Sequence, residues 1–592
     1  MRRIRPDLVV AVLLLAAHTA AVWGHTGVFW GDIGRWSHEV ERLALGELPY
    51  RDFQWHYPPF GLFVEGLAAR VIGTDRTPLS IITTALAAML VVASVFLSRR
   101  ALGRHDTALS AIALILSFSF AQTVGAALPL GLYSPAAIVG AVCTAIAAVN
   151  FLRSLSNDPG NSVAWMALFC ALGVLSKQDF WVPAAYMVGT TVVRSRRLTA
   201  AWISGGVTLA GVAGIIAIAG VDILLPLLGG FGHATLAGGQ GFPSWERITI
   251  DILTLALVGG TVFALASLAK RQLLVKPLLV CGAVAVLAAG IHVTASMQTT
   301  LPAPGELSSP TQNNLSYQLK RDSPLLRPAI GWMRERVSRT PIPVSLAPLL
   351  LLAVALRWRR LPTPRREFIA LTLGLAVALR FRRAFEGTEW FEFVLALPIL
   401  LAAVELLLAF DEAELRRWRT ASVAVLGVLA IWAYAALGRG PGTGRHFAEV
   451  TSTLRGPMHW RAGEAHDYAV VLAAVDSLDA SRTRPLVAFG FTGGFNYFLK
   501  RPNPFPITQD FYFSAFNADS LVEHRPPGLL LIDNHVFKGG SFGAATFALG
   551  QWEQPRVPAP YDFYDRPRFE RLRAGCSPVP LQGSMFDLYS CP

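Results

Sequence analysis

Long apolar runs without charged residues constrain this chain more than any other feature of its sequence. Residues 8–23 form one such run, and it is long enough to cross the hydrocarbon core of a bilayer. Over the 592 residues, 53% are hydrophobic and only 15% are charged, too few to cover the surface of a water-soluble protein of this size. The sequence therefore predicts a polytopic α-helical membrane protein.

About thirteen apolar runs have a length that suits a membrane-spanning helix. We expect these spans near residues 7–24, 79–97, 107–126, 134–152, 162–176, 180–193, 199–220, 250–269, 277–296, 342–356, 367–379, 391–410 and 420–438. The first run is long for the core of a signal peptide and more spans follow it, so we expect it to remain in the protein as the first span.

Basic residues are in excess, giving a formal net charge of +13, and they occur in short clusters between the apolar runs. Clusters of this kind indicate membrane topology, and no nucleic-acid partner is expected. Clusters at residues 2–5, 99–104 and 194–197 share one side if the N-terminus is cytoplasmic, as the positive-inside rule requires. The region after about residue 440 then lies outside a bacterial cell membrane, in the periplasm or at the cell surface.

The composition changes near residue 438, which divides the chain into a membrane module, 1–438, and an outer C-terminal region, 439–592. In the second part, short apolar runs at 485–491 and 528–532 predict buried strands, and residues 468–478 have helical spacing. The Gly-rich segment 490–494 lacks the Lys-Ser/Thr of a Walker loop and predicts a plain strand-to-helix turn. We therefore expect a small extracytoplasmic α/β domain.

Five cysteines separate into two groups by their surroundings. Cys143, Cys170 and Cys281 lie inside apolar runs, where a thiol behaves as a small hydrophobic group. Cys576 and Cys591 lie in the outer, oxidising region. We predict that these two form a disulfide that closes a short loop at the end of the chain.

The first outer segment, residues 25–78, contains the most informative pattern. Asp32 comes directly after the first span. Residues 37–45 have Val40, Leu43 and Ala44 on one side and charged residues elsewhere, which predicts a short amphipathic helix lying on the membrane interface. From these residues alone, an ordinary outer loop with a solvated aspartate remains an open interpretation.

The order of motifs in this segment resembles the GT-C superfamily of integral-membrane glycosyltransferases, which includes protein O-mannosyltransferases and lipid A aminoarabinose transferases. The matching residues are Asp32, then Gly46, Pro49, Tyr50 and Asp52, then Tyr57, Pro58 and Pro59. The resemblance is specific over residues 1 to about 100. It implies inverting transfer of a hexose or pentose from a polyprenyl-phosphate donor to a lipid, polysaccharide or protein acceptor at the outer face.

The resemblance also implies roles for individual residues. Asp32 matches the catalytic carboxylate of the family, and an Asp within reach of an acceptor hydroxyl can take its proton. Asp52 could bind the acceptor or tune Asp32, and the sequence does not order these two roles. We expect His56 and Tyr57 to bind substrate. Lys177, at the outer end of a span, is a candidate ligand of the donor phosphate or the acceptor, with simple snorkelling of its side chain equally open.

A second basic cluster contradicts the topological trend. The positive-inside arrangement places Arg380, Arg382 and Arg383 on the outer side. Guanidinium groups bind phosphate well, so we expect these arginines to contact the lipid phosphate of the donor. Internal pairing with Glu386, Glu389 and Glu392 is the alternative.

No cofactor is expected, and a divalent metal is the alternative that the sequence leaves open. Asp32-Ile33-Gly34 is not the Asp-x-Asp pair with which some GT-C members hold a divalent metal, and His25, His38 and His56 lack ligand spacing. A transporter or flippase of lipid-linked glycans and a noncatalytic envelope scaffold are the rival functions. A transporter would carry its polar residues along a path through the membrane midplane, whereas here they concentrate in outer loops. This distribution favours an active site at the outer surface.

Overall fold

The structure is a computed structural model, and it describes part of the chain. The described residues are 32–53, 55, 57–102, 135–155, 161–177, 180–195, 198–219, 449–460, 462–488, 494–504, 527–534, 571–582, 584 and 586–592, with isolated positions between 9 and 23 and between 363 and 371.

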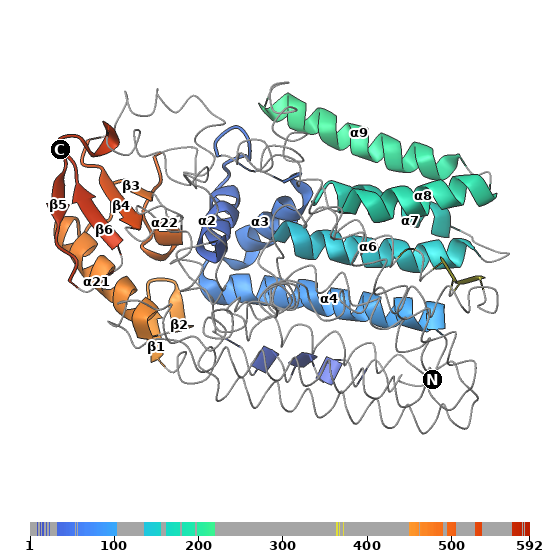
Figure 1. Cartoon of the computed structure of the whole chain (residues 1–592), viewed down its shortest axis with the longest axis horizontal. Helices are drawn as coiled ribbons and strands as arrows, with labels where there is room; N and C mark the ends of the chain where they lie inside the picture. The colour runs from blue at the N-terminus through green and yellow to red at the C-terminus, as the bar shows by residue number, and fades with distance from the viewer. Residues whose placement is uncertain are drawn as a thin grey trace, which may run out of the picture.

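Five helices of the membrane module run side by side in Figure 1. They are α4 (Arg76–Leu102), α6 (Pro135–Ser154), α7 (Ser162–Val174), α8 (Trp181–Ser195) and α9 (Thr199–Ala219). Within the described part of the chain, three segments are long and apolar enough to cross a bilayer: Arg76–Leu97, Ala136–Ser154 and Thr199–Ile218. These three agree with the spans predicted near 79–97, 134–152 and 199–220.

Helices α7 and α8 are shorter than membrane spans. They have 13 and 15 residues, and at 1.5 Å per residue the first measures about 20 Å, against a hydrocarbon core of about 30 Å. The apolar runs at 162–176 and 180–193 are therefore helical as predicted, and the described helices are shorter than the hydrocarbon core is thick.

The other predicted spans lie wholly or largely outside the described residues. They are the spans near 7–24, 107–126, 250–269, 277–296, 342–356, 367–379, 391–410 and 420–438.

The predicted outer loop contains two helices, α2 (Asp32–Ala44) and α3 (Phe60–Ile72). Helix α3 was not predicted, because its 13 residues are too few for a span and glycines interrupt the apolar run. Those glycines allow close packing. A Cβ on Gly61 would lie 2.6 Å from Ala136 Cα of α6, and a Cβ on Gly66 would overlap the Leu43 side chain of α2. Helix α3 thus packs directly against both neighbours.

The C-terminal part of the structure contains a hairpin and a mixed sheet. Strands β1 (Glu449–Thr453) and β2 (Gly456–Trp460) are antiparallel, and α21 (Ala462–Leu478) follows them. The second sheet has the order β3-β4-β6-β5, with β3 (Leu486–Ala488), β4 (Leu530–Asn534), β5 (Ser577–Val579) and β6 (Phe586–Ser590). Strands β3 and β4 are parallel, and the other pairs are antiparallel. The runs predicted as strands at 485–491 and 528–532 correspond to β3 and β4.

One hydrophobic core continues from the membrane module into this C-terminal part. It contains Val40 of α2, Leu62 of α3, Val91 of α4, Phe495 of α22 (Gly494–Phe498) and Phe586 of β6. The rings of Phe495 and Phe586 meet edge to face at 4.8 Å. In Figure 1, α2 and α3 lie between the helix bundle and the sheet.

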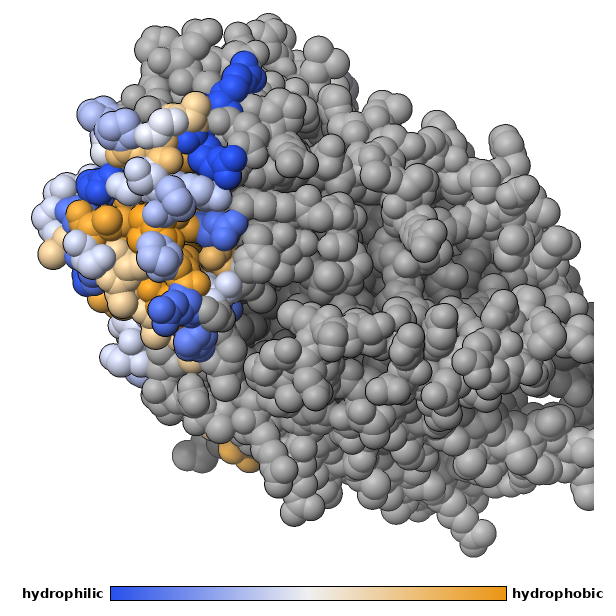
Figure 2. All heavy atoms as spheres, turned by 60° about the vertical axis from the view of Figure 1, so that its left-hand side comes forward, coloured by the Kyte–Doolittle hydropathy of each residue, from blue (hydrophilic) through white to orange (hydrophobic). Residues whose placement is uncertain are grey.

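Exposed apolar side chains distinguish the two parts. Among the described residues, the large exposed hydrophobic side chains all come from the first 209 positions, including Trp202 and Leu209 of α9. In Figure 2, the described C-terminal surface mixes hydrophobic side chains with strongly hydrophilic ones. This contrast suits helices that face lipid and a domain that faces water.

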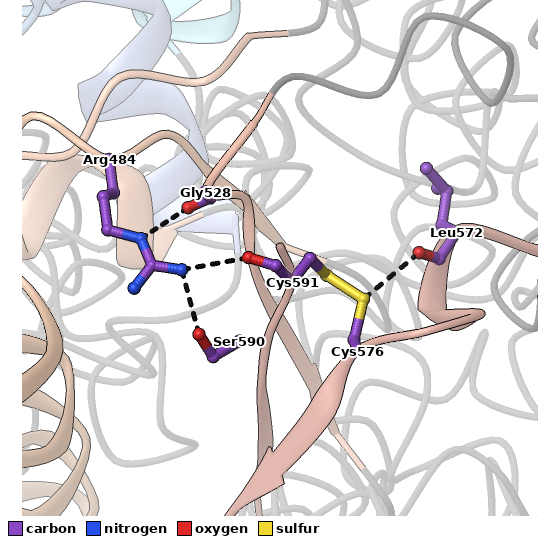
Figure 3. The surroundings of a disulfide bond; sticks show 6 residues. All are labelled: Arg484, Gly528, Leu572, Cys576, Ser590 and Cys591. Atoms are coloured by element: carbon purple, nitrogen blue, oxygen red, sulfur yellow. Dashed lines mark hydrogen bonds between the residues drawn. A yellow bond between two sulfur atoms is a disulfide. The ribbon is translucent and has the colours of Figure 1, made fainter.

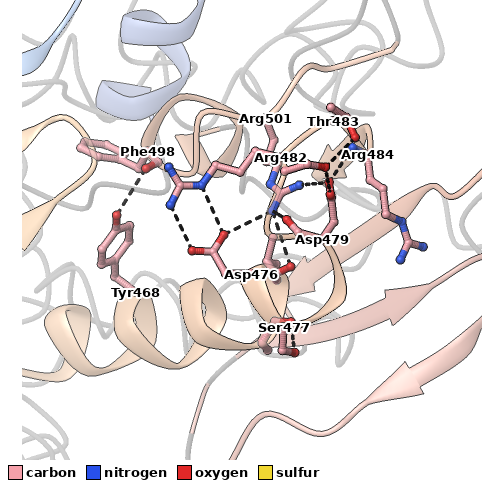
Figure 4. Close-up of polar contacts among 12 residues, drawn as sticks. Tyr468, Asp476, Ser477, Asp479, Arg482, Thr483, Arg484, Phe498 and Arg501 are labelled. Carbon is pink, nitrogen blue, oxygen red and sulfur yellow. Dashed lines mark hydrogen bonds and ion pairs between the residues drawn. The ribbon is translucent and has the colours of Figure 1, made fainter.

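Two sets of contacts connect separate segments of the C-terminal domain. The structure contains the predicted disulfide between Cys576 and Cys591, and beside it Arg484 donates hydrogen bonds to Gly528 O (2.6 Å) and Cys591 O (3.2 Å) (Figure 3). Arg501 has no exposed side-chain surface and forms ion pairs with Asp476 and Asp479 at the end of α21 (Figure 4). It also donates to Asp479 O at 2.6 Å, which satisfies a carbonyl that ends the helix.

Candidate active site

Helix α2 begins at Asp32. Aspartate suits this position, because the first turn of a helix favours negative charge. The side chain of Asp32 lies outside the described part of the structure. Its catalytic role stays a prediction, and the helix that carries it is defined.

The interfacial position predicted for α2 is wrong in one respect: its charged side is buried. Arg35, His38 and Arg42 are 5%, 5% and 7% exposed, and Glu39 is fully buried. Arg35 Nη1 lies 3.4 Å from Glu39 Oε1. An amphipathic pattern predicts two different faces of a helix, but it cannot tell whether the polar face meets water or other polar groups of the protein.

The loop after α2 has a defined shape. Gly46 has φ +100°, a conformation that favours glycine, and Tyr50 adopts φ +69° without being glycine. Arg42 donates to Glu47 Oε2 at 2.6 Å and to Asp52 O at 2.8 Å. The Tyr50 hydroxyl donates to the carbonyl of Tyr57. The Gly46-to-Asp52 motif therefore folds as a closed turn held from α2.

Asp52 accepts hydrogen bonds on both carboxylate oxygens. Arg51 Nε and Nη2 donate to them at 2.9 and 2.7 Å, and the backbone N–H of Leu48 donates at 2.7 Å. The hydrogen bond from Arg51, followed by that from Leu48, lowers the pKa of Asp52 to about 2. A carboxylate with so low a pKa is a poor proton acceptor near neutral pH.

Lys177 and Tyr57, both predicted as substrate ligands, come together in the structure. Lys177 Nζ lies 5.1 Å from the centre of the Tyr57 ring, a cation–π distance. The backbone supports this contact, because Phe60 N–H donates to Leu175 O at 2.9 Å and joins the start of α3 to the end of α7. Trp55 packs edge to face on Tyr57 at 5.5 Å.

The position of Lys177 decides against simple snorkelling. Its side chain is 1% exposed, whereas a snorkelling lysine carries its ammonium group into water. Holding a cation out of water is costly unless aromatic faces or negative charges compensate. Lys177 therefore places a positive charge inside the protein, beside the motif that begins with Asp32.

Glu65 of α3 is a buried carboxyl group that the sequence reasoning did not single out. It is fully buried, and both its oxygens lack a hydrogen bond of normal geometry. Burial raises the pKa of Glu65 well above its usual range, and the neighbouring Trp36 indole of α2 offsets this only in part. The available signal was a single acid among the otherwise apolar residues 60–69 of α3.

Other predicted site residues fall outside the described part of the chain. They are His56, Arg380, Arg382 and Arg383. Within the part that is described, no group of three His, Cys, Asp or Glu side chains has an arrangement that could hold a metal ion.

Comparison with known proteins gives structural neighbours only. Neither a family model nor a characterised protein matches the sequence. The chain is similar to ArnT from Cupriavidus metallidurans bound to undecaprenyl phosphate, with a TM-score of 0.40 and 12% identity over 98% of this chain and 97% of that one. It is also similar to the Archaeoglobus fulgidus oligosaccharyltransferase in complex with Zn and sulfate, with a TM-score of 0.48 and 11% identity over 94% of this chain and 70% of that one. TM-scores below 0.5 assign neither fold nor activity.

Proposed function

We propose that this chain is a GT-C-type membrane glycosyltransferase that transfers a sugar from a polyprenyl-phosphate carrier to an envelope acceptor at the outer face. The observation that carries the proposal is the position of Lys177. A buried ammonium group stacks on Tyr57 of the Tyr-Pro-Pro motif, in the segment that follows the helix beginning at Asp32. A buried cation stacked on this motif suits a reaction whose leaving group is a phosphate.

Asp32 is the general base in this proposal. The acceptor hydroxyl oxygen attacks the anomeric carbon while the bond from that carbon to the phosphate oxygen breaks. The hydroxyl proton passes to the Asp32 carboxylate, and polyprenyl phosphate departs with the electron pair of the broken bond. Attack opposite the leaving group inverts the anomeric centre. Asp52 suits this role less well, because the hydrogen bonds from Arg51 and Leu48 lower the pKa of its carboxyl group and make it a weaker base.

Lys177 contributes on the donor side. Its charge stabilises the phosphate both before and during departure, and the Tyr57 ring keeps the ammonium group in place. Arg380, Arg382 and Arg383 are proposed as further ligands of the same phosphate, on the basis of their predicted outer position. Asp52 is proposed to fix the turn that presents Tyr57. Its bonds to Leu48 and Arg51 keep the turn closed.

The proposal is tested with purified protein in nanodiscs, supplied with labelled polyprenyl-phosphate sugars and an envelope extract. We expect transfer of label to an acceptor and release of polyprenyl phosphate. Lys177→Gln removes a charge-assisted hydrogen bond worth about 1.5 to 3 kcal/mol, so the KM for donor should rise about tenfold or more.

A matched pair of variants at Tyr57 tests the stacking. Tyr57→Phe keeps the aromatic face and should leave the donor KM near that of the wild type, whereas Tyr57→Leu removes it and should raise the KM about twofold or more. Normal donor KM in folded Lys177→Gln protein would contradict the phosphate role. Movement of the labelled lipid across the bilayer without transfer would replace the transferase proposal by a flippase.

A further inference from the structure

A buried arginine of the C-terminal domain forms an ion pair with the helix of Asp32, beside the packing of α22 against α2. Arg455 lies in the turn between β1 and β2, and its Nη2 is 2.6 Å from Glu41 Oε1 of α2. Its Nε donates to Tyr497 O at 2.7 Å, and its guanidinium stacks 4.3 Å from the centre of the Tyr497 ring. Arg455 therefore contacts both α2 and α22, which also pack against each other.

The short loop between α3 and α4 closes this contact from a second side. Tyr497 Oη donates to Thr74 O at 2.8 Å, and Arg76 N–H donates to Arg455 O at 3.1 Å. Asp75 lies 3.4 Å from Arg455 Nη1. The domain is thus bonded both to α2 and to the start of α4.

The ion pair between Glu41 and Arg455 is largely buried, so its strength depends on the relative position of the two side chains. The two side chains are 14% and 5% exposed. Burial raises the pKa of Glu41, but the neighbouring His38 and Arg455 outweigh it, so the pKa lies below its usual value and Glu41 remains ionised. A buried ion pair adds little net stability, because desolvation offsets the attraction. It does fix the relative position of the two elements that carry it.

Helix α2 connects this contact to the candidate base. Glu41 follows Asp32 by nine residues, about 14 Å along the helix axis at 1.5 Å per residue. Leu43, two residues after Glu41, lies against Gly66 of α3. A helix held so closely at its C-terminal end cannot rotate or slide without moving its first residue.

We propose that Arg455 is a positioning residue: through Glu41, the C-terminal domain sets the position of α2 and hence of Asp32. This inference rests on the proposed function, in which Asp32 takes the acceptor proton. Arg455 touches no substrate in this account. Its loss allows Asp32 to shift, and misplacement of a catalytic group by about 1 Å reduces turnover about 100-fold.

The test uses the full chain in nanodiscs and three variants: Glu41→Gln, Arg455→Gln and the double variant. We expect kcat to fall about 10- to 100-fold in each, with the donor KM within about threefold of the wild type, because the phosphate ligand Lys177 lies on another element. The double variant should be no slower than Arg455→Gln alone, since both changes remove one contact.

Lys500→Gln is the matched control. Lys500 Nζ pairs with Asp75 at 3.3 Å in the same interface, but its side chain is 38% exposed and this partner lies before α4, not on α2. An exposed pair of this kind contributes little, so kcat should stay within about twofold of the wild type. Unchanged kcat in folded Arg455→Gln protein would overturn the positioning role. A loss of activity that only follows the loss of folded protein would do the same.

Hydrogen exchange of the α2 amides separates this inference from the proposed function. Exchange should be faster in Arg455→Gln than in the wild type or in Lys500→Gln, whatever reaction the protein catalyses. If the wild type transfers no sugar, the proposed function fails, and α2 exchange still decides whether Arg455 holds the helix. Equal α2 exchange in all three proteins would refute the coupling.

Discussion

The C-terminal domain and helix α2 both bury charged side chains, but they find their partners over very different distances. In the domain, Arg501 pairs with Asp479 and Asp476, which lie 22 and 25 positions away. In α2, Glu41 pairs with Arg455, which lies 414 positions away. Arg501 is therefore held by residues of its own domain, whereas Glu41 of α2 is paired with a separate part of the chain. An ion pair between residues close in the chain stabilises one domain, whereas an ion pair between distant residues fixes the position of two parts of the molecule relative to each other.

Of the three stability tests, removing Arg501 should have the largest effect, because its ion pairs lie within the C-terminal domain. Arg501→Met leaves two acids without their buried partner and the end of α21 without its cap. We expect a loss of about 3 kcal/mol, the low end for a buried ion pair, because Asp476 is 31% exposed. Chemical denaturation followed by fluorescence of the domain measures it. An equally large loss of stability in Lys500→Gln would contradict the distinction between buried and exposed ion pairs.

Reducing the disulfide should weaken the same domain slightly less. Cys576 and Cys591 are separated by 15 positions, and a loop of that length corresponds to about 3 kcal/mol or less of unfolded-state entropy. Alkylation before and after reduction should label two thiols only after reduction. The Cys576→Ser/Cys591→Ser variant should unfold at lower denaturant concentration. Two reactive thiols in the unreduced domain would disprove the bond.

Replacing Glu65 should change stability least. This change tests the packing of α3 against α2 rather than the C-terminal domain. Because burial raises its pKa, the folded protein keeps a proton that the unfolded chain releases near its ordinary value of 4.5. Stability therefore falls as pH rises above that value. Glu65→Gln removes the penalty, and its Tm at pH 8 should exceed that of the wild type by about 2 °C or more, with little difference at pH 4. A lower Tm at pH 8 would show that the carboxyl is ionised and paired.

Much of the fold could be predicted from local sequence. Residues 485–491 and 528–532 are short apolar runs between turn residues, and both contain strands. The apolar run at 134–152 matches a helix at Pro135–Ser154. Cys576 and Cys591 were paired from their outer position. These elements depend on hydrophobic periods and on partners nearby in the chain.

The candidate site could be predicted only in part, for physical reasons. The motif order singled out Asp32 and Tyr57, and the predicted helix end singled out Lys177. Neither predicted the stacking of Lys177 on Tyr57, since no local pattern relates residues 120 positions apart. The charged side of α2 was expected to face water. A helix face that meets water and one that meets buried polar partners have the same spacing of charged residues, so the sequence does not distinguish them. Arg455 carries no signal in its own neighbourhood, so its role appears only once the fold brings it to Glu41.

Asp32→Asn, measured beside Asp52→Asn, tests the central claim most directly. Asn keeps the shape of Asp but cannot accept a proton near neutral pH, so turnover in Asp32→Asn should fall about 100- to 10,000-fold with folding and donor binding unchanged. Asp52 holds the turn that presents Tyr57 to Lys177, so Asp52→Asn should raise the donor KM more than it lowers kcat. Near-normal turnover in Asp32→Asn together with a large loss of turnover in Asp52→Asn would show that Asp52, and not Asp32, is the general base. Near-normal turnover in both would contradict the mechanism.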